Sequence, residues 1–241
     1  MIERAKPALS AAIDLLYPPA LYCISCGNLI DRSRPYALCD RCRHETDWRF
    51  GELPSGHEFG KGFYCAVYTS PVKRLVRNMK YHDKPHIAEY IAEAMADRAA
   101  GEPDIAATDI VVPVPMHAVK KRLRGYNQTE LIASHLAKLL GIAYAPDMLI
   151  KTRPTETLST KNRDERLLAL SDVFTANPAP APYPPVPAPN PYQDSPAKIL
   201  LIDDVFTTGS TADACTRALF RAGASSVTLF VFATGAMGIK S

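Results

Sequence analysis

The stretch ILLIDDVFTTGST, residues 199–211, joins four aliphatic residues to two aspartates and a small, hydroxyl-rich turn. A continuously apolar strand of this kind is typical of a parallel sheet that is buried on both faces. The pattern predicts a strand at 198–202, a turn at 203–210, a helix at 211–222 and a second strand at 226–232. This order is a βαβ unit, and it predicts an α/β fold.

The remainder of the chain supports the same fold class. Strands are expected at 63–70 and from residue 109, and helices are expected after Pro71, at 87–100 and at 129–141. Residues 151–170 show no sustained period, so we expect a loop and then a charged helix or turn. Residues 177–196 contain nine prolines and predict a polyproline or disordered insertion.

The amino-acid composition excludes few classes of function. The net charge of +3 is too small to predict nucleic-acid binding, and no run approaches the ~18 apolar residues of a membrane helix. Asp14 and the pair Pro18-Pro19 argue against a signal peptide, so residues 1–20 are expected to form a short docking helix. A cytosolic protein is therefore expected, with its six cysteines reduced or bound to metal.

The aspartates and the turn together predict a ligand that carries both hydroxyl groups and phosphate. Asp203 and Asp204 occupy the carboxyl end of a strand, where ligands bind in open parallel sheets. The turn leads into a helix that starts near Ser210 or Thr211, and free amides at a helix N-terminus attract anions. A ribose 5-phosphate meets both conditions.

These residues also have three other interpretations. The acidic strand end is also typical of P-loop NTPases, but the chain contains no GxxxxGK[ST] motif. Metal-binding acids of response-regulator receivers stand near the start of their domain, whereas only 37 residues follow Asp204 here. A capped turn with two solvated acids is the structural alternative.

The segment LLIDDVFTTGST resembles the phosphoribosyl pyrophosphate (PRPP) signature of type I phosphoribosyltransferases. The resemblance implies that Asp203 and Asp204 contact the ribose 2- and 3-hydroxyls, with Mg²⁺ accompanying PRPP. It also implies that the 5-phosphate is held by Thr207, Thr208, Gly209, Ser210 and Thr211. Several purine-salvage relatives carry an acid where this chain has Thr207, which makes purine salvage the less favoured activity.

Four cysteines near the N-terminus have the spacing of a structural zinc site. Cys23-x₂-Cys26 and Cys39-x₂-Cys42 form two knuckles twelve residues apart, and four thiolates would close a tetrahedral site. Two disulfides are the alternative. His44 and His57 are expected on the surface, and Cys65 and Cys215 are expected to serve in packing.

Three basic stretches, at 71–86, 113–133 and 151–166, each have the composition of a solvated face. Together they could line the mouth of one site that attracts pyrophosphate or single-stranded DNA. Tyr81 or Tyr126 could then stack on a base.

A narrower resemblance covers most of the chain apart from 177–196. LLYPP, the four-cysteine ribbon, VRNMKYHDK, PVPM…RLRGYNQTELIA and the PRPP turn occur in the order of the ComF (competence protein F/GntX) family. The resemblance implies a cytosolic role in natural transformation, with single-stranded DNA and a helicase partner. Asn127 and Gln128 belong to the family's RGxNQ motif, and no role is assigned to them here. Leu158 and Ala169 stand where many relatives have Gln and Asn.

The same resemblance implies further anion contacts. Residues of the pyrophosphate-side loop and three cations would face the anion: Pro113, Val114, Pro115, Met116, Lys80, Arg122 and Arg124.

The expected organisation is an N-terminal helix and zinc ribbon at 1–50, followed by a phosphoribosyltransferase-like domain at 60–241 with a mostly parallel sheet. Three functions remain open. The first is a ComF-like protein that binds PRPP or a related ribose phosphate and handles incoming DNA. The second is an active Mg²⁺-dependent phosphoribosyltransferase that acts on an unidentified base or amine, and the third is a scaffold with a vestigial site.

Overall fold

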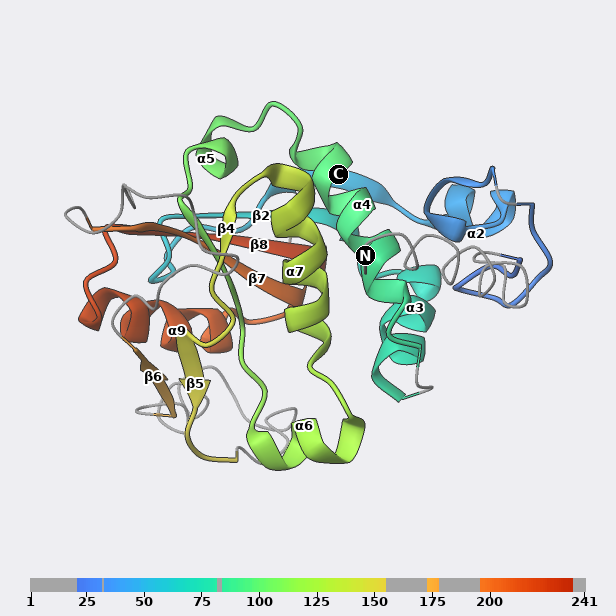
Figure 1. Ribbon diagram of the computed structural model, residues 1–241. Helices are drawn as coiled ribbons and strands as arrows, with labels where there is room; N and C mark the ends of the chain where they lie inside the picture. The colour runs from blue at the N-terminus through green and yellow to red at the C-terminus, as the bar shows by residue number, and fades with distance from the viewer. Residues whose placement is uncertain (1–20, 32, 82–83, 155–172, 178–195, 236–241) are drawn as a thin grey trace, which may run out of the picture.

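The computed structural model describes residues 21–31, 33–81, 84–154, 173–177 and 196–235 (Figure 1). Several predictions lie outside the described residues: the helix at 1–20, the charged segment from residue 155, the positions of Leu158 and Ala169, and the insertion between 178 and 195. None of the described helices is long and apolar enough to span a membrane.

A six-stranded sheet with the order β1-β2-β8-β7-β3-β4 lies at the centre of the described chain. Only β1 and β2 are antiparallel to each other, and every other neighbouring pair in this sheet is parallel. The predicted α/β fold with a mostly parallel sheet is confirmed. The strands are β1 (Trp48–Glu52), β2 (Lys61–Val67), β3 (Ile110–Pro113), β4 (Ala143–Tyr144), β7 (Lys198–Phe206) and β8 (Ser226–Thr234).

The long helices were predicted, and the short elements were not. Helices α3 (Ser70–Tyr81), α4 (Ile87–Ala99), α7 (Gln128–Leu140) and α9 (Ser210–Arg221) lie where the apolar periodicity places them. Elements of only a few residues contain no complete period from which they could be predicted. They are the edge strands β1 and β4, η1 (Pro35–Ala37), α2 (Asp40–Glu45), α5 (Pro103–Ala106), α6 (Ala118–Arg124), and the antiparallel pair β5 (Leu149–Lys151) and β6 (Phe174–Ala176).

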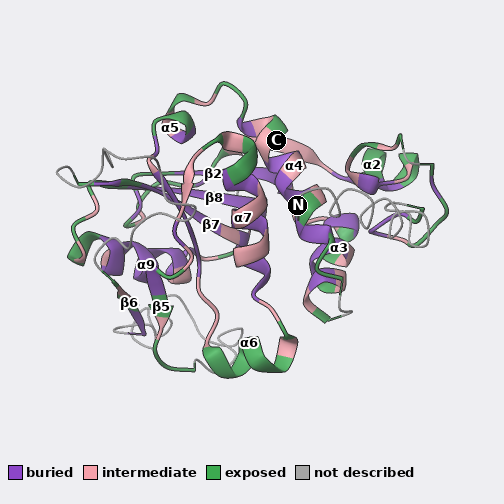
Figure 2. Cartoon of the chain, viewed as in Figure 1, coloured by how far each residue is buried: buried purple, intermediate pink, exposed green. Residues whose placement is uncertain are grey.

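The central strand β7 has one apolar side toward each layer of helices. Leu200 and Ile202 belong to the buried cluster that includes residues of α3, α4 and α7, whereas Ile199 and Leu201 belong to the cluster under α9 (Figure 2). Successive side chains of a strand point to opposite faces, so two layers of helices bury both faces of β7. The same alternation sends Asp203 toward the α9 face and Asp204 toward the face of α3 and α7.

The expected turn at 203–210 is wrong in its first half. Strand β7 continues through both aspartates to Phe206, and it pairs with β8 as far as Phe206 opposite Thr234. Aspartate is uncommon in strands, but pairing with β8 outweighs this local preference. The turn itself is therefore confined to Thr207–Gly209, directly before α9.

The four-cysteine segment packs against the rest of the chain. Cys23, Ile24 and Leu38 are buried in the same cluster as residues of α3 and α4. Trp48, at the start of β1, has the Arg98 guanidinium of α4 4.4 Å from its ring centroid. The edge strand of the sheet thus begins inside the range predicted for the ribbon, and the division into domains at 1–50 and 60–241 stays a prediction.

Candidate functional site

The loops that follow β3 and β7 diverge to opposite faces of the sheet. The chain leaves β3 through α6 and α7 to reach β4, and it leaves β7 through α9 to reach β8 on the other side. Ligands of open α/β sheets bind at such a switch point, beyond the carboxyl ends of the two strands. Two adjoining cavities lie here, and both are bordered by Asp203 and Thr211.

The first cavity, of about 370 Å³, contains most of the predicted PRPP signature. Its lining includes Asp203, Thr207, Thr208, Gly209, Ser210 and Thr211. The Thr208 and Ser210 hydroxyl oxygens lie 3.2 Å apart, and Gly209 has a φ of 77° just before the first turn of α9. Hydroxyls and unpaired amides at a helix N-terminus can bind a phosphate group.

Asp203 lies where the two cavities meet. Its Oδ1 atom accepts the backbone N–H of Asp204 at 2.8 Å. Burial, and then the charge of Asp204, raise the pKa of Asp203 to about 7. Hydroxyl groups of a ligand could donate to this carboxylate from either cavity.

Asp204 is instead buried in a network with two helices. Its Oδ2 atom lies 2.6 Å from Lys80 Nζ at the end of α3, and it accepts a hydrogen bond of 3.2 Å from Gln128 Nε2 at the start of α7. Burial by itself would lower the pKa of Lys80, but the attraction of Asp204 outweighs it and raises this pKa. Lys80 therefore keeps its positive charge next to Asp204. Asp204 itself lines neither cavity.

The second cavity, of about 390 Å³, is bordered by the predicted pyrophosphate-side loop. Val114, Pro115 and Met116 line it, whereas Pro113 remains in β3, paired with Ile202. The carbonyl oxygen of Val114 accepts hydrogen bonds from Asn127 Nδ2 and Thr129 Oγ1 at 3.2 and 2.6 Å. The RGxNQ segment thus holds this loop in place through Asn127, while Gln128 holds Asp204.

The cations that line the second cavity are Lys120 and Lys151, which the sequence did not single out. Both belong to the basic stretches identified above, but a stretch alone does not tell which member faces a cavity. Burial lowers the pKa of Lys151. Arg122 is exposed on α6, and Arg124 donates to Gln128 Oε1 while its guanidinium lies 5.5 Å from the ring centroid of Tyr81.

A histidine predicted to be on the surface, His57, is instead packed against the turn Thr207–Gly209. The His57 side chain is only 7% exposed, stacks on Phe59 at 4.9 Å between centroids, and meets Phe206 edge-on. Its Nδ1 atom donates to Asp213 Oδ2 at 3.0 Å, and Asp213 Oδ1 also accepts the Glu58 N–H at 2.9 Å. A Cβ atom on Gly209 would lie 2.2 Å from His57 Cε1, so this turn has room only for glycine.

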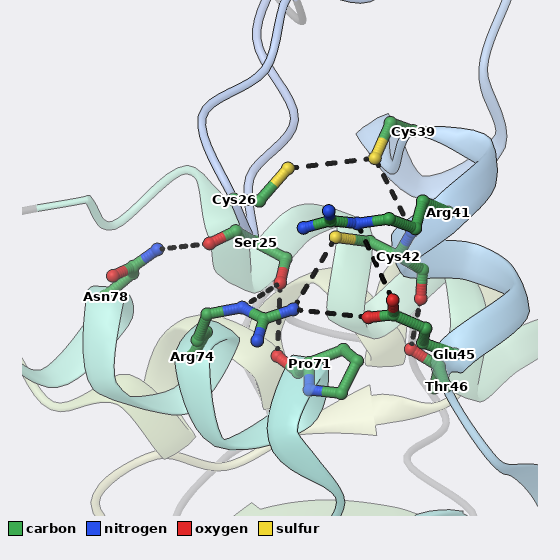
Figure 3. Close-up of polar contacts among 10 residues, drawn as sticks. All are labelled: Ser25, Cys26, Cys39, Arg41, Cys42, Glu45, Thr46, Pro71, Arg74 and Asn78. Carbon is green, nitrogen blue, oxygen red and sulfur yellow. Dashed lines mark hydrogen bonds and ion pairs between the residues drawn. The ribbon is translucent and has the colours of Figure 1, made fainter.

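The four predicted metal ligands are brought together. The sulfur atoms of Cys23, Cys26, Cys39 and Cys42 all lie within 4.8 Å of one another. Figure 3 draws the last three of these side chains, with Cys26 Sγ 3.7 Å from Cys39 Sγ. Sulfurs of a tetrahedral site with 2.3 Å bonds would be about 3.8 Å apart. Burial and then the neighbouring thiols raise the pKa of Cys26 to about 12, so a cation would be needed to keep all four as thiolates.

We expect Gly209→Ala to destabilise the protein more than Gly141→Ala. Both glycines have positive φ, where a side chain costs about 1–2 kcal/mol, but only at Gly209 does the added Cβ atom meet other atoms within 4 Å. Combining Gly209→Ala with His57→Ala should remove the extra destabilisation at Gly209. Urea unfolding of the two single variants and the double variant measures this effect as a coupling free energy. Equal costs at the two glycines would contradict the close packing of His57.

We expect Asp203→Asn to stabilise the ligand-free protein at pH 8 and not at pH 4. Folded Asp203 keeps its proton up to about pH 7, whereas an unfolded aspartate loses it near 3.8. The folded state therefore holds an extra proton between these values, and the free energy of unfolding falls as the pH rises through this window. Asparagine has no charge to bury. Thermal unfolding between pH 4 and 8 tests this, with the exposed Asp147→Asn as control; an equal gain at both ends would refute the raised pKa.

No protein-family model matches the chain. It is 28% identical over 212 residues to a DNA utilization protein YhgH of Salmonella typhi, an alignment that covers 85% of this chain and 80% of the relative. It is 23% identical over 230 residues to competence protein F of Haemophilus influenzae, covering 94% and 90%. Competence protein ComFC of Streptococcus pneumoniae is 32% identical over 119 residues, or 49% of this chain and 45% of that protein.

The solved structures that are similar to this chain have low TM-scores. A glutamine PRPP amidotransferase from B. subtilis has a TM-score of 0.41 at 17% identity, and covers 64% of this chain and 30% of its own. An adenine phosphoribosyltransferase from Leishmania tarentolae also has a TM-score of 0.41, at 13% identity, and covers 77% and 95%. Scores this low add nothing to the assignment. The similarity to competence protein F and YhgH extends along most of the chain, and it confirms the resemblance to the ComF family that the motifs predicted.

Proposed function

We propose that this protein binds PRPP, or a related ribose phosphate, together with Mg²⁺, and that it takes part in DNA uptake and the handling of single-stranded DNA. The observation that carries the ligand proposal is the first cavity, in which one acid and the whole hydroxyl-rich turn line the same space. The names of the relatives, competence protein F and DNA utilization protein, support the proposal for DNA. A competence helicase is the partner that the ComF resemblance implies.

The proposed roles follow from the positions of the side chains. Asp203 would accept hydrogen bonds from the ribose hydroxyls, and the amides and hydroxyls of Thr207–Thr211 would hold the 5-phosphate. Asp204 would join the ribose contacts only by exchanging its present partner Gln128 or Lys80. Val114–Met116, Lys120 and Lys151 line the second cavity, where a pyrophosphate group would lie. Lys80 does not line it but pairs with Asp204, which is also bonded by Gln128 of that cavity.

Zinc and Mg²⁺ are proposed to bind at different sites. Zinc would be held by Cys23, Cys26, Cys39 and Cys42, and since four thiolates leave no coordination position open its role would be structural. Mg²⁺ would arrive with the diphosphate and neutralise part of its charge.

We expect the protein to bind PRPP in the presence of Mg²⁺, and Asp203→Asn to weaken that binding about tenfold or more, because a hydrogen bond to a charged group is lost. Calorimetric titration measures both, with Asp147→Asn as the matched control on an exposed acid. The effect on affinity would be opposite in sign to the stabilisation expected at pH 8. A parent protein that fails to bind would favour the scaffold with a vestigial site.

A pyrophosphate-release assay on the same samples separates ligand binding from turnover. Release of pyrophosphate with a base or amine would establish the alternative function, an active phosphoribosyltransferase. Binding without release across such acceptors would favour a ribose-phosphate sensor that acts in DNA handling.

A specific surface favours DNA as a second ligand. Helix α6 has no buried residue and carries Lys120, Lys121, Arg122 and Arg124, and the Tyr81 ring beside Arg124 is 70% exposed. Tyr126, by contrast, uses its hydroxyl to bond the Met79 carbonyl oxygen. Of the two tyrosines expected to stack on a base, Tyr81 is therefore the exposed one.

We expect Arg122→Ala to weaken single-strand binding and to reduce its dependence on salt. Loss of one phosphate contact lowers the slope of log K against log [salt] by about 0.7 on single strands. Fluorescence anisotropy at several salt concentrations measures the slope. Lys138→Ala removes an exposed charge near the far end of α7 and serves as control. An unchanged slope in Arg122→Ala would exclude α6 as the contact.

A further inference from the structure

Helix α3 contacts the four-cysteine segment along most of its length. The Asn78 side chain donates to the carbonyl oxygens of Ile24 and Ser25 at 3.0 and 3.3 Å, and Ser25 Oγ donates to the Pro71 carbonyl oxygen at 3.3 Å (Figure 3). Ile24 and Ser25 lie between Cys23 and Cys26, in the backbone of the first knuckle. The position of α3 is therefore tied to residues that a metal ion would hold in place.

Arg74 is the residue of α3 that reaches the sulfur cluster itself. Its Nη2 atom lies 3.7 Å from Cys42 Sγ and 3.8 Å from Glu45 Oε2, and its Nε atom donates to Ser25 Oγ at 3.2 Å. One guanidinium thus contacts both knuckles, since Ser25 belongs to the first and Cys42 to the second (Figure 3). A positive charge beside a thiolate offsets the negative charge of a four-thiolate metal site.

The other end of the same helix reaches the ligand site. Lys80 forms the 2.6 Å ion pair with Asp204, and the Met79 carbonyl oxygen accepts the hydroxyl of Tyr126 from the RGxNQ segment. Arg74 and Lys80 are six residues apart, which is about 9 Å along the axis of an α-helix. A shift of α3 at the cysteines would therefore displace Lys80 relative to Asp204.

We propose that Arg74 is a positioning residue that couples the metal-binding cysteines to the ribose-phosphate site through α3. The proposal rests on the proposed function of that site. Metal bound by the four thiolates holds Ile24, Ser25 and Cys42 in place, and Arg74 and Asn78 hold α3 on them. Lys80 then stays against Asp204 Oδ2, the atom that also accepts a hydrogen bond from Gln128 of the second cavity. Loss of the metal frees these anchoring groups, so that both α3 and the ligand affinity respond.

The first test measures zinc retention by competition with a chromogenic chelator, using Arg74→Met, Arg74→Lys and Arg77→Met. Arg77 lies on the same helix, is exposed, and loses the same charge in the control. We expect Arg74→Met to lower zinc affinity about 10- to 100-fold, as replacements next to metal ligands do. Arg74→Lys should recover part of the loss, because it keeps the charge without the forked geometry. Equal affinities in Arg74→Met and Arg77→Met would overturn the role of Arg74 at the metal.

The second test asks whether the effect reaches the other end of α3. Hydrogen exchange of the segment 75–81 is measured in the parent and in Arg74→Met, both at saturating zinc, and in the parent as zinc is withdrawn stepwise. We expect faster exchange in the variant and on zinc withdrawal, together with weaker PRPP binding. Unchanged exchange and unchanged ligand affinity in both cases would overturn the coupling.

These measurements also separate this inference from the proposed function. A parent that binds no PRPP would refute the proposed function, while exchange in segment 75–81 would still decide the coupling without a ligand. If Arg74→Met does not fold, Arg74→Lys and the zinc-withdrawal series on the parent provide the same decision.

Discussion

The ion pair between Lys80 and Asp204 holds the central strand to the helices around it. Asp204 receives Lys80 from α3 at 2.6 Å and Gln128 from α7 at 3.2 Å, so one carboxylate joins three elements that are far apart in the chain. Removing one partner of a buried ion pair destabilises the folded state by more than the intact pair stabilises it, because the remaining charge is left without compensation. The position of α3 therefore depends on Asp204, and so does the contact between α3 and the cysteines. The proposed ligand site depends on the same residue.

Adjacent acids have different surroundings because they lie within a strand. Asp203 borders the two cavities on the α9 side, where burial and its neighbour raise its pKa, and Asp204 is used inside the protein. A carboxylate that destabilises the folded state unless a ligand or a proton offsets it is typical of a binding site rather than of a structural role. Gly209 is constrained in a similar way, because an added Cβ atom would meet His57, which Asp213 holds in place.

The four-cysteine segment is joined to the rest of the described chain more closely than a separate ribbon followed by a domain would be. Residues of the cysteine segment share the buried cluster of α3 and α4, and β1 begins directly after that segment. In the ComF-like protein proposed here, zinc would then support the ligand site as well as its own loop. A DNA strand on α6 would lie next to the second cavity, since Lys120 and Leu123 of that helix line it.

The sequence by itself determined the fold class, the long helices, the cysteine set and the hydroxyl-rich turn, because each of these is a local pattern of period, spacing or motif. It could not place the end of β7, because the pairing of Asp203–Phe206 with β8 depends on a strand more than twenty residues away in the chain. Nor could it show that His57 packs behind Gly209, that Lys120 and Lys151 rather than Arg122 line the second cavity, or that Arg74 meets Cys42. These are contacts between distant segments. Only the tertiary structure decides them, since the way helices pack on the two faces of the sheet selects which side chain of a polar stretch points inward.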